Sequence, residues 1–478
     1  MNKCAILWKE ERPLFLLWAL AACAYAALSL FRHWHLESSA YDLGIQDQAV
    51  WHYSRFQVPS DSITQFHDLL GDHFSPVMAL FAPLYWLCPR VEMVLAAQAF
   101  LITLPVFPIF LFARKRLGRF PAYCLAAAYA LSWGVQVFAD FDVHELAFAA
   151  PAAAFAVYFA DEEKWAPCFI SAALLGLCKE DQWLLAAFLG LVLFLRGQRW
   201  KGAVLAFAAF SLFVVEVKWL IPFLGQRPYG HWNYSQLGPG PLAALGTCLA
   251  HPFRVLGLLF SDQAKSVTLL CLFLPFLFGS FFSPWVLLAV PLIAERMLSD
   301  NADFWVMKYQ YNLVPMVVLC LAAADGFGRL LGRIQDPVRR GRILRGGAWF
   351  LLAVNLVAAQ LPHLPLGGLI RRPFWHFTPR EALAPQAFAL IPPDASVLAQ
   401  SCLVPHLSHR QVIHDFWWDW ETSPPEEDYV VICKGKDAWP LQPEDLDWAV
   451  TLKESQGYSP VFQKEGWYVL KKTGRPSP

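Results

Sequence analysis

The chain has 478 residues, of which 57% are hydrophobic and 16% are charged. Its 38 lysines and arginines balance 38 aspartates and glutamates, so no basic surface points to nucleic acid. A mean hydropathy of +0.39 and many separate apolar runs argue against an ordinary soluble enzyme. They predict an α-helical protein that crosses a membrane many times, because helices pair their own backbone groups in lipid. The eleven cysteines form no zinc-type pattern, and no disulfide framework is expected.

The first apolar run, Pro13–Phe31, follows Lys3, Lys9 and Arg12. Positive charge flanking a span marks its cytoplasmic side. We therefore expect the N-terminus in the cytoplasm and residues 32–75 as the first outer loop. No small-residue cleavage site follows the run cleanly, so it is expected to stay as a membrane span.

The next apolar stretch, residues 74–88, is shorter than the roughly 20 residues that a crossing helix needs. If it crossed, the basic run Arg114–Arg116 after the following span would lie outside, against the usual distribution of positive charge. We therefore expect an interfacial helix, with Tyr85 and Trp86 anchored among the lipid headgroups.

With that choice, the later basic loops fall on the cytoplasmic side and the acidic or histidine-bearing loops on the outer side. Residues 329–345, with six arginines and one aspartate, form the clearest cytoplasmic loop. The predicted crossings number about eleven and cover residues 13–31, 91–113, 120–138, 146–160, 166–178, 183–195, 203–224, 267–282, 285–294, 311–327 and 347–361. The long connection at residues 225–265 is expected outside.

The chain changes character after the last predicted span. Residues 1–361 are predicted to form the transmembrane domain, and residues 362–478 a small C-terminal extracytoplasmic α/β domain. Its predicted helices cover residues 381–390 and 441–454, and its predicted strands cover residues 396–400, 411–414, 428–433, 458–464 and 466–471.

Two carboxylates, Asp42 and Asp47, follow the first span. A carboxylate just past the membrane boundary can meet a lipid-linked substrate, although Asp42 could instead only cap a helix. The two residues are separated by about 140° round a helix, so they cannot both aim at one atom. We expect Asp42 to act as a catalytic base and Asp47 to support or replace it.

Two further outer segments combine carboxylates with imidazoles, namely Asp72 with His73 and His144 with Glu145. Such groups suit a divalent cation, which would neutralise a departing phosphate. The alternative is that they are interfacial residues bonded to loop backbone.

Other polar residues lie at the same level of the membrane. Lys179, Glu180 and Asp181 interrupt an apolar hairpin, where ionisable groups are candidates for function; Lys179 could hold a phosphate, or the three could form a structural ion pair. Tyr309, Tyr311 and Asn312 open a later span and could bind sugar or phosphate, or form part of an aromatic interface belt.

These motifs resemble a family of bacterial and archaeal membrane proteins known as domain of unknown function 2079. The shared stretches are Tyr41–Gln48, His73–Pro76, Phe141–Glu145 and Lys179–Asp181, in that order, and the resemblance covers about residues 35–330. The family more often has His-Pro-Glu after the phenylalanine, where this chain has Asp142–Glu145.

The layout is also similar to that of the GT-C glycosyltransferases, which include protein O-mannosyltransferases and lipid A aminoarabinose transferases. The resemblance implies Asp42 as the base, Asp72 and His73 near a metal or phosphate, and Lys179 as a phosphate ligand. It implies a polyprenyl-phosphate-linked sugar as the donor, with Mn²⁺, Mg²⁺ or Zn²⁺ as the cofactor if one is used.

We therefore predict a glycosyltransferase that acts at the outer face of the cytoplasmic (inner) membrane, in contact with the bilayer, on an acceptor that the sequence does not identify. One alternative is a transporter of a lipid-linked sugar or small solute, which predicts ionisable residues at the bilayer midplane. Another is a sensor or assembly scaffold whose working part is the outer domain.

Overall fold

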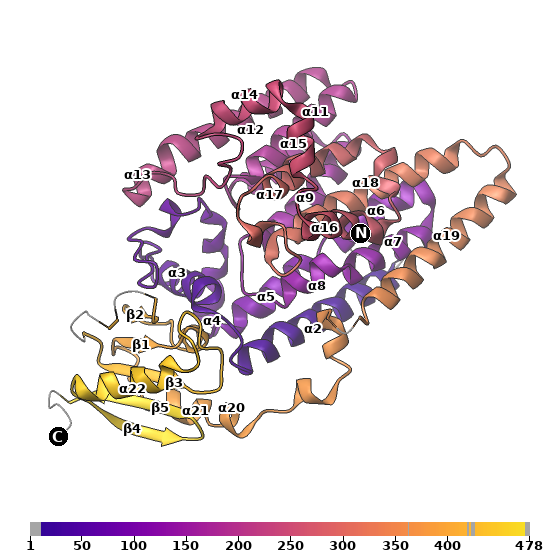
Figure 1. Ribbon diagram of the computed structural model, residues 1–478. Helices are drawn as coiled ribbons and strands as arrows, with labels where there is room; N and C mark the ends of the chain where they lie inside the picture. Colours follow the sequence, from indigo (N-terminus) through magenta and orange to yellow (C-terminus); the bar gives the residue numbers. More distant parts are fainter. Residues whose placement is uncertain (1–10, 362, 418–419, 422–425, 474–478) are drawn as a thin grey trace.

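The computed structural model describes residues 11–361, 363–417, 420–421 and 426–473. Figure 1 shows a body of packed helices with a small sheet, drawn in yellow, at one end. Lys3 and Lys9, on which the predicted cytoplasmic position of the N-terminus partly depends, lie outside the described residues.

The α-helices of the body alternate between long spans and shorter apolar segments. Their bounds are α2 (Arg12–Trp34), α3 (Ile45–Ser54), α4 (Ala82–Leu87), α5 (Glu92–Thr103), α6 (Val106–Leu117), α7 (Arg119–Leu131), α8 (Trp133–Ala139), α9 (Leu146–Asp161), α10 (Trp165–Gly176), α11 (Gln182–Leu195), α12 (Arg199–Val215), α13 (Ile221–Gly225), α14 (Pro241–Ala250), α15 (Pro252–Leu258), α16 (Gln263–Phe273), α17 (Ala289–Met297), α18 (Leu313–Gly332) and α19 (Pro337–Ala358).

Five helices in the described part of the chain are long and apolar enough to cross a membrane, and the number is up to seven if each of two bent pairs counts as one span. Five shorter apolar helices accompany them, among them α9, α10 and α11. The predicted total of about eleven crossings therefore stays a prediction, because it requires several of these short helices to cross.

Three helices in the bundle give it two chemically different ends. The helices α9, α11 and α18 begin directly after Glu145, Asp181 and Asn312, which belong to predicted site segments. Their other ends lead to basic or acidic residues that contact one another. The sixteen residues of α9 separate its ends by about 24 Å. The site segments and the basic loops therefore lie at opposite ends of the bundle, as the charge distribution predicted.

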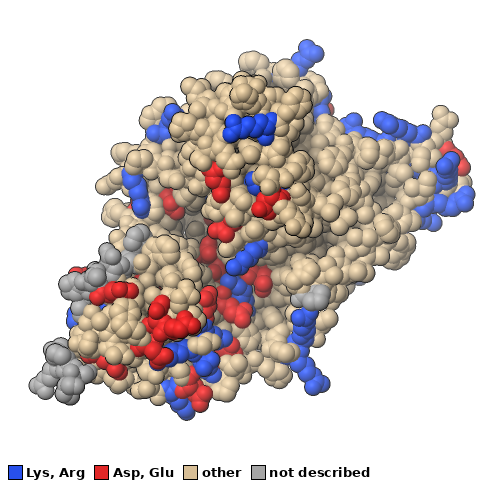
Figure 2. Space-filling view, viewed as in Figure 1, with Lys and Arg blue, Asp and Glu red and all other residues tan. Residues whose placement is uncertain are grey.

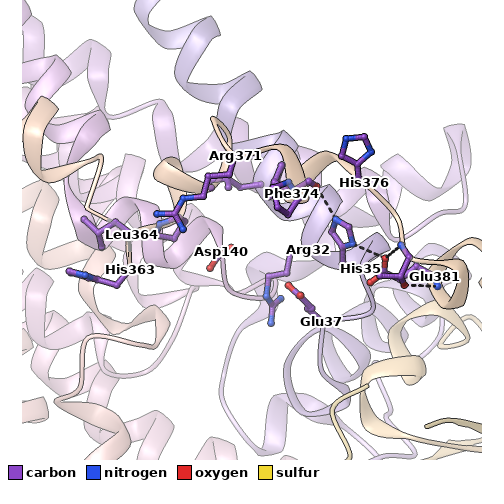
Figure 3. A pocket seen from close by; sticks show the side chains of 15 residues that line it. Arg32, His35, Glu37, Asp140, His363, Leu364, Arg371, Phe374, His376 and Glu381 are labelled. Carbon is purple, nitrogen blue, oxygen red and sulfur yellow. Dashed lines mark hydrogen bonds and ion pairs between the residues drawn. The ribbon is translucent and has the colours of Figure 1, made fainter. Parts of the chain in front are cut away.

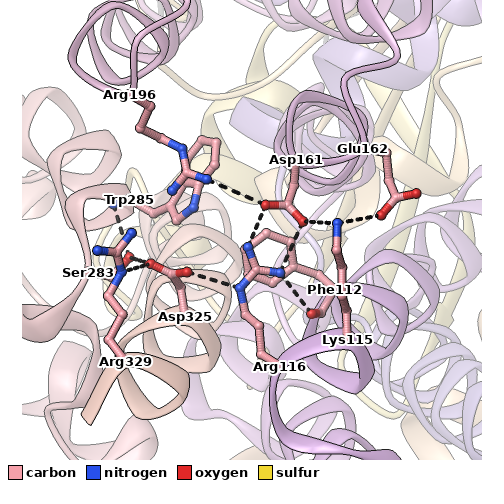
Figure 4. A network of polar contacts seen from close by, with 10 residues as sticks. All are labelled: Phe112, Lys115, Arg116, Asp161, Glu162, Arg196, Ser283, Trp285, Asp325 and Arg329. Atoms are coloured by element: carbon pink, nitrogen blue, oxygen red, sulfur yellow. Dashed lines mark hydrogen bonds and ion pairs between the residues drawn. The ribbon is translucent and has the colours of Figure 1, made fainter. Parts of the chain in front are cut away.

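The end remote from the site segments is held by a network of ion pairs (Figure 4). Asp161 at the end of α9 lies 3.1 Å from Arg116, 3.3 Å from Lys115 and 3.6 Å from Arg196. Arg116 also lies 3.0 Å from Asp325 of α18. Because charges at membrane depth are stable only when paired or solvated, this network fixes four helix ends together.

The surface in Figure 2 shows the same separation. Separate, scattered charges show on the helical body, whereas lysines and arginines gather at the tip formed by the turn between α18 and α19. Mixed charges cover the sheet at the opposite end and continue along its boundary with the helices.

The C-terminal residues form a five-stranded sheet of order β2-β1-β3-β5-β4. The strand β1 pairs in parallel with β2 and β3, whereas β5 pairs antiparallel with β3 and β4. All five predicted strands are present, and α22 (Asp445–Ser455) corresponds to the second predicted helix. The strand bounds are β1 Val397–Ala399, β2 Ile413–His414, β3 Tyr429–Cys433, β4 Tyr458–Lys464 and β5 Trp467–Lys472.

One face of this sheet packs against the first outer loop. A single apolar cluster contains Ala40, Ile45 and Ile63 of that loop together with Val404 and Val431 of the C-terminal part. The sheet and the loop therefore share a core. The division into domains 1–361 and 362–478 stays a prediction, and the described contacts cross it.

Two local predictions were wrong. Tyr85 is not a headgroup anchor, because its side chain is buried and its hydroxyl donates to Asp47. The predicted helix at residues 381–390 is split into α20 (Pro379–Ala382) and α21 (Ala384–Phe388), with Pro385 at the start of the second helix, where proline is tolerated. The connection 225–265 contains the helices α14 and α15, and its position outside the membrane stays a prediction.

The ion-pair network predicts that two neighbouring substitutions lower the free energy of unfolding by different amounts. Asp161→Asn removes a carboxylate that is only 6% exposed and leaves buried guanidinium groups without their partner. We expect a loss of about 3 kcal/mol in the free energy of unfolding, measured by unfolding of the purified protein in detergent. Glu162→Gln, at a carboxylate that is 30% exposed, should lose less than about 1 kcal/mol. Equal effects would contradict the assigned role of the network.

Candidate functional site

Asp42 lies in a π-helical turn, Ala40–Gly44, between the first span and α3. The cap of this turn is Ser39, whose side chain accepts a hydrogen bond from the backbone N–H of Tyr41. The alternative in which Asp42 only caps a helix is therefore wrong. Gly44 is required because a Cβ there would lie 2.9 Å from Val404 of the C-terminal part. The sheet thus holds the turn from one side and leaves the Asp42 carboxylate 24% exposed.

A chain of charges leads from Asp42 into the bundle. The Nε2 atom of His144 lies 3.2 Å from the Asp42 carboxylate, and its Nδ1 atom lies 3.6 Å from Glu145. Lys179 lies 4.0 Å from the same glutamate. These residues come from three separate segments, which the sequence had predicted to meet.

The charges of this chain follow from its own pairs. Burial alone would lower the pKa of His144, but the Asp42 and Glu145 carboxylates outweigh burial and raise it to about 9. Burial would likewise raise the pKa of Glu145, but His144 and Lys179 bring it down to about 2. At neutral pH His144 is therefore an imidazolium between two carboxylates.

A second cluster lies beside the first one. His231 lies 2.9 Å from the carboxylate of Asp72, and its ring stacks on that of His73 with the ring centres 3.9 Å apart. The other side of His73 contacts Glu180 at 2.7 Å, which also accepts a 3.0 Å hydrogen bond from Tyr229. The candidate ligand atoms of Asp72, His73 and His231 all lie within 4.8 Å of one another.

A close approach of two glycines brings the halves of this second cluster together. A Cβ on Gly71 would lie 2.1 Å from the backbone nitrogen of Gly225. Only glycines allow the two backbones to pass so closely. Asp72 and His73 follow the first glycine directly, and the segment with Tyr229 and His231 follows the second.

Lys179 joins the two clusters. Burial would lower its pKa, but the neighbouring carboxylates Asp181, Glu145 and Glu180 outweigh burial and raise it, so the ammonium stays charged. Asp181 is in turn hydrogen-bonded to Glu295 of α17, and burial together with this carboxyl neighbour raises the pKa of Glu295.

The residues that open α18 surround the same space. Tyr311 is electrostatically coupled to both Lys179 and Asp42, and the ring of Tyr309 meets Phe141 edge-on at 5.5 Å. Asn312 is fully buried, and its amide nitrogen lies 3.4 Å from the Tyr309 carbonyl. The two tyrosines therefore lie at the candidate site, whereas Asn312 lies beneath it.

Several buried polar atoms around the site have no hydrogen-bond partner among the described residues. They include both terminal nitrogens of Arg296, the side-chain oxygens of Gln310 and Asn312, and Oε1 of Gln182. Arg296 is only 3% exposed, and burial lowers its pKa to about 10. Its Nε donates a 2.8 Å hydrogen bond to the Phe304 carbonyl, but two enclosed N–H groups without acceptors are unfavourable, so the site is suited to an anionic, hydrogen-bonding ligand.

Sequence reasoning missed Glu295 and Arg296 and did not assign a role to His231. The two charged residues directly follow the apolar segment that was predicted as a span at residues 285–294. An ionisable pair at the end of an apolar run is a usable signal. His231 lies in the connection at residues 225–265, which the sequence placed outside without a role for any of its residues.

Asp47 does not join the site. Its carboxylate is fully buried and accepts hydrogen bonds from the hydroxyls of Tyr85 and Ser408, while His409 lies 3.1 Å away. Asp47 therefore connects α3, α4 and the C-terminal part, and this set of contacts is called the clasp. The clasp agrees with the supporting role of Asp47 and not with a second base.

Sequence comparison identifies the family. The family described as "Predicted membrane protein (DUF2079)" matches residues 32–469. The chain belongs to this family. The match extends past the predicted range of 35–330 and includes the C-terminal sheet, so the clasp at Asp47 joins two parts of the family region. A search of curated proteins gave no match.

Comparison with solved structures shows a GT-C fold. A crystal structure of ArnT from Cupriavidus metallidurans bound to undecaprenyl phosphate matches with a TM-score of 0.56 and 13% identity, covering 97% of this chain and 98% of that one. The apo form of the same protein matches with a TM-score of 0.55, 13% identity and coverage of 96% and 98%. The oligosaccharyltransferase of Archaeoglobus fulgidus matches with a TM-score of 0.46 and 11% identity, over 98% of this chain and 74% of that one.

The clasp predicts that Asp47 acts on stability. Asp47→Ala leaves two hydroxyls and an imidazole without their common acceptor, and we expect a loss of about 3 kcal/mol, measured by fluorescence-detected thermal unfolding. His409→Gln removes a side chain that is 24% exposed and should lose less than about 1 kcal/mol. A stable Asp47→Ala protein would show that the clasp does not hold the C-terminal part.

Proposed function

We propose that the protein is a glycosyltransferase that moves a sugar from a polyprenyl-phosphate donor to an acceptor at the outer face of the cytoplasmic membrane. The observation that carries this proposal is the Asp42 carboxylate held by His144 at the entrance to a site that also contains Lys179. The GT-C fold supports it, and one structure of that fold has undecaprenyl phosphate bound.

Asp42 would accept the proton of the acceptor hydroxyl as that oxygen attacks the sugar. The imidazolium of His144 lies 3.2 Å away and holds the carboxylate in position; a base acts in its ionised form. Attack on the face opposite the phosphate inverts the configuration of the sugar carbon. The C–O bond to the phosphate breaks, and the lipid phosphate leaves with the electron pair.

Lys179 and Arg296 would neutralise that phosphate. Both are electrostatically coupled to Tyr311, and the terminal nitrogens of Arg296 have no partner among the described residues. Cations that are already in place stabilise a leaving group without reorganisation. The carboxyl groups of Glu180 and Asp181 lie near Lys179, and that of Glu295 lies near Arg296.

A divalent cation fits the second cluster better than the first. Asp72, His73 and His231 supply one carboxylate and two imidazoles, a donor set that suits Zn²⁺ or Mn²⁺. The bond from His73 to Glu180 is the outer-shell contact that metal-binding histidines commonly have. Among the described residues, the donor atoms of Asp72, His73 and His231 lie within 4.8 Å of one another, and His144 and Glu145 are not part of this group. A cation at the second cluster would supply further positive charge for the phosphate.

The transporter alternative predicts ionisable groups midway along the spans. In the described part of the chain, the site residues instead precede α9, α11 and α18 at one end of the bundle. The scaffold alternative does not account for enclosed polar atoms without partners. No observation in the described residues favours either alternative over sugar transfer.

The proposed base predicts a selective loss of activity. Asp42→Asn keeps the shape of the side chain but cannot accept the proton, and we expect transfer from a polyprenyl-phosphate sugar to fall at least about 100-fold. Transfer would be measured with purified protein against membrane extracts as the acceptor source. Asp394→Asn, at an exposed carboxylate of the C-terminal part, is the matched control and should transfer normally. Unchanged turnover in the folded Asp42→Asn protein would exclude this base.

The proposed cation site predicts stoichiometric metal binding. Protein treated with chelator and reloaded with Zn²⁺ or Mn²⁺ should retain about one ion per chain by elemental analysis, because three donors converge on one point. His231→Ala should lose most of this ion, whereas His67→Ala, at an exposed histidine of the first outer loop, should keep it. Equal metal content in both variants would exclude this cluster as the site.

A further inference from the structure

A second cavity, separate from the candidate site, lies between the helical bundle and the C-terminal part. It has a volume of about 480 Å³, which lies within the range for small-molecule sites. One side is formed by the end of α2 and the residue that follows α8. The other side is formed by residues 363–381, here called the strap, which run from α19 to the sheet (Figure 3).

The bundle side of the cavity has an excess of carboxylates. Glu37 and Asp140 line it together with Arg32, but the guanidinium of Arg32 is already paired with Asp142. Burial, with Glu37 and Asp142 nearby, raises the pKa of Asp140 to about 6. An additional cation would therefore be stabilised on this side.

The strap side has the opposite character. His363, Arg371 and His376 line the cavity from the strap, and in Figure 3 Arg371 and His363 lie across the cavity from Glu37. The acid of the strap, Glu381, is engaged by Lys436 and by His35. Arginine and histidine in such a position suit a phosphate group.

The rim of the cavity suits a membrane surface. It lies where α2 and α19, both long enough to span a membrane, end. The strap exposes Ile370 at 75%, Trp375 at 46% and Phe377 at 46%. Aromatic and apolar side chains at the end of a span are typical of the interface between headgroups and acyl chains.

We propose that this cavity binds the zwitterionic headgroup of a membrane lipid, with the lipid phosphate at Arg371 and the strap histidines and a primary ammonium at Glu37 and Asp140. The apolar rim would hold the start of the acyl chains. This proposal does not depend on sugar transfer, because it concerns different residues and a binding event that can be measured without turnover.

The cavity is connected to the candidate site by one ion pair. Arg32 lines the cavity and bonds Asp142, whose other oxygen accepts a 2.8 Å hydrogen bond from the backbone of Ser39. Ser39 caps the turn that carries Asp42. An ammonium bound beside Arg32 would therefore act on the ion pair between Arg32 and Asp142. Through Asp142 it would act on the backbone hydrogen bond that holds Ser39 and the turn.

The test is lipid retention by the purified full-length protein. Delipidated protein in detergent would be mixed with equal amounts of phosphatidylethanolamine, phosphatidylcholine and phosphatidylglycerol, and bound lipid would be counted by native mass spectrometry. We expect one phosphatidylethanolamine per chain, favoured about tenfold. Phosphatidylcholine has no N–H donors on its ammonium, and phosphatidylglycerol has no cation.

Paired variants assign the binding to this cavity. Glu37→Gln with Asp140→Asn should bring the preference for phosphatidylethanolamine over phosphatidylcholine close to one, and Arg371→Gln should weaken retention of all three lipids. Arg339→Gln, an exposed arginine near the start of α19 at the other end of the bundle, is the control and should behave like the unmodified protein. Each variant would first be checked for an unchanged unfolding temperature.

Two results would overturn the proposal. The first is equal retention of the three lipids by the unmodified protein, or a preference that survives the paired carboxylate substitutions. The second comes from competition between the bound lipid and a soluble headgroup. We expect soluble phosphoethanolamine to displace the lipid only at a far higher concentration than the lipid itself. If it binds as tightly as the lipid, the site recognises a free amine phosphate and the membrane part of the proposal is wrong.

Discussion

Charged groups at membrane depth must be paired or solvated, and this constraint arranges both ends of the protein. At one end, Asp161 and Asp325 gather the basic residues that end α6, α11 and α18. At the other end, α9 begins next to an imidazole and a carboxylate, and α11 begins next to Lys179 and two carboxylates. None of the side-chain atoms of the first network is among the buried polar atoms without a hydrogen-bond partner in the described residues, so the network acts as structure. The polar groups at the second end are only partly matched, which is what a ligand site requires.

The position of Asp42 depends on two supports that are far apart in the sequence. From the bundle, Asp142 bonds the backbone of Ser39. From the turn that follows β1, Ser401 accepts a 3.2 Å hydrogen bond from the backbone of Ala40, and Val404 packs against Gly44. The C-terminal part therefore supports the candidate site. The family match continues to residue 469 and includes this support.

Much of the fold and part of the site could be predicted from the sequence. The order of apolar and polar segments gave the helices and the strands, because burial and backbone pairing determine both patterns. Motif position indicated Asp42, His144 and Lys179, since ionisable residues beside apolar runs are rare enough to stand out. The sequence left open whether Asp47 supports Asp42 or replaces it, because that depends on what packs against Asp47 after folding.

The other site residues that the sequence missed have the same explanation, because their contacts form only in the folded protein. Glu295 and Arg296 at the end of an apolar segment could have been noticed, but only the folded protein shows that both terminal nitrogens of Arg296 lack a partner among the described residues. His231 joins Asp72 because Gly71 and Gly225 let two backbones pass, and a contact between residues 154 positions apart leaves no local pattern. His144 carries the residue type of a metal ligand, but only the folded protein shows that it lies between the carboxylates of Asp42 and Glu145.

The most direct measurement is a cryo-electron microscopy structure of the protein with a polyprenyl phosphate. The account predicts that the lipid phosphate lies within hydrogen-bond distance of Lys179 and Arg296, with the Asp42 carboxylate open to the space in front of it. A phosphate bound at the opposite end of the bundle, or one that leaves Lys179 and Arg296 without contact, would contradict the account.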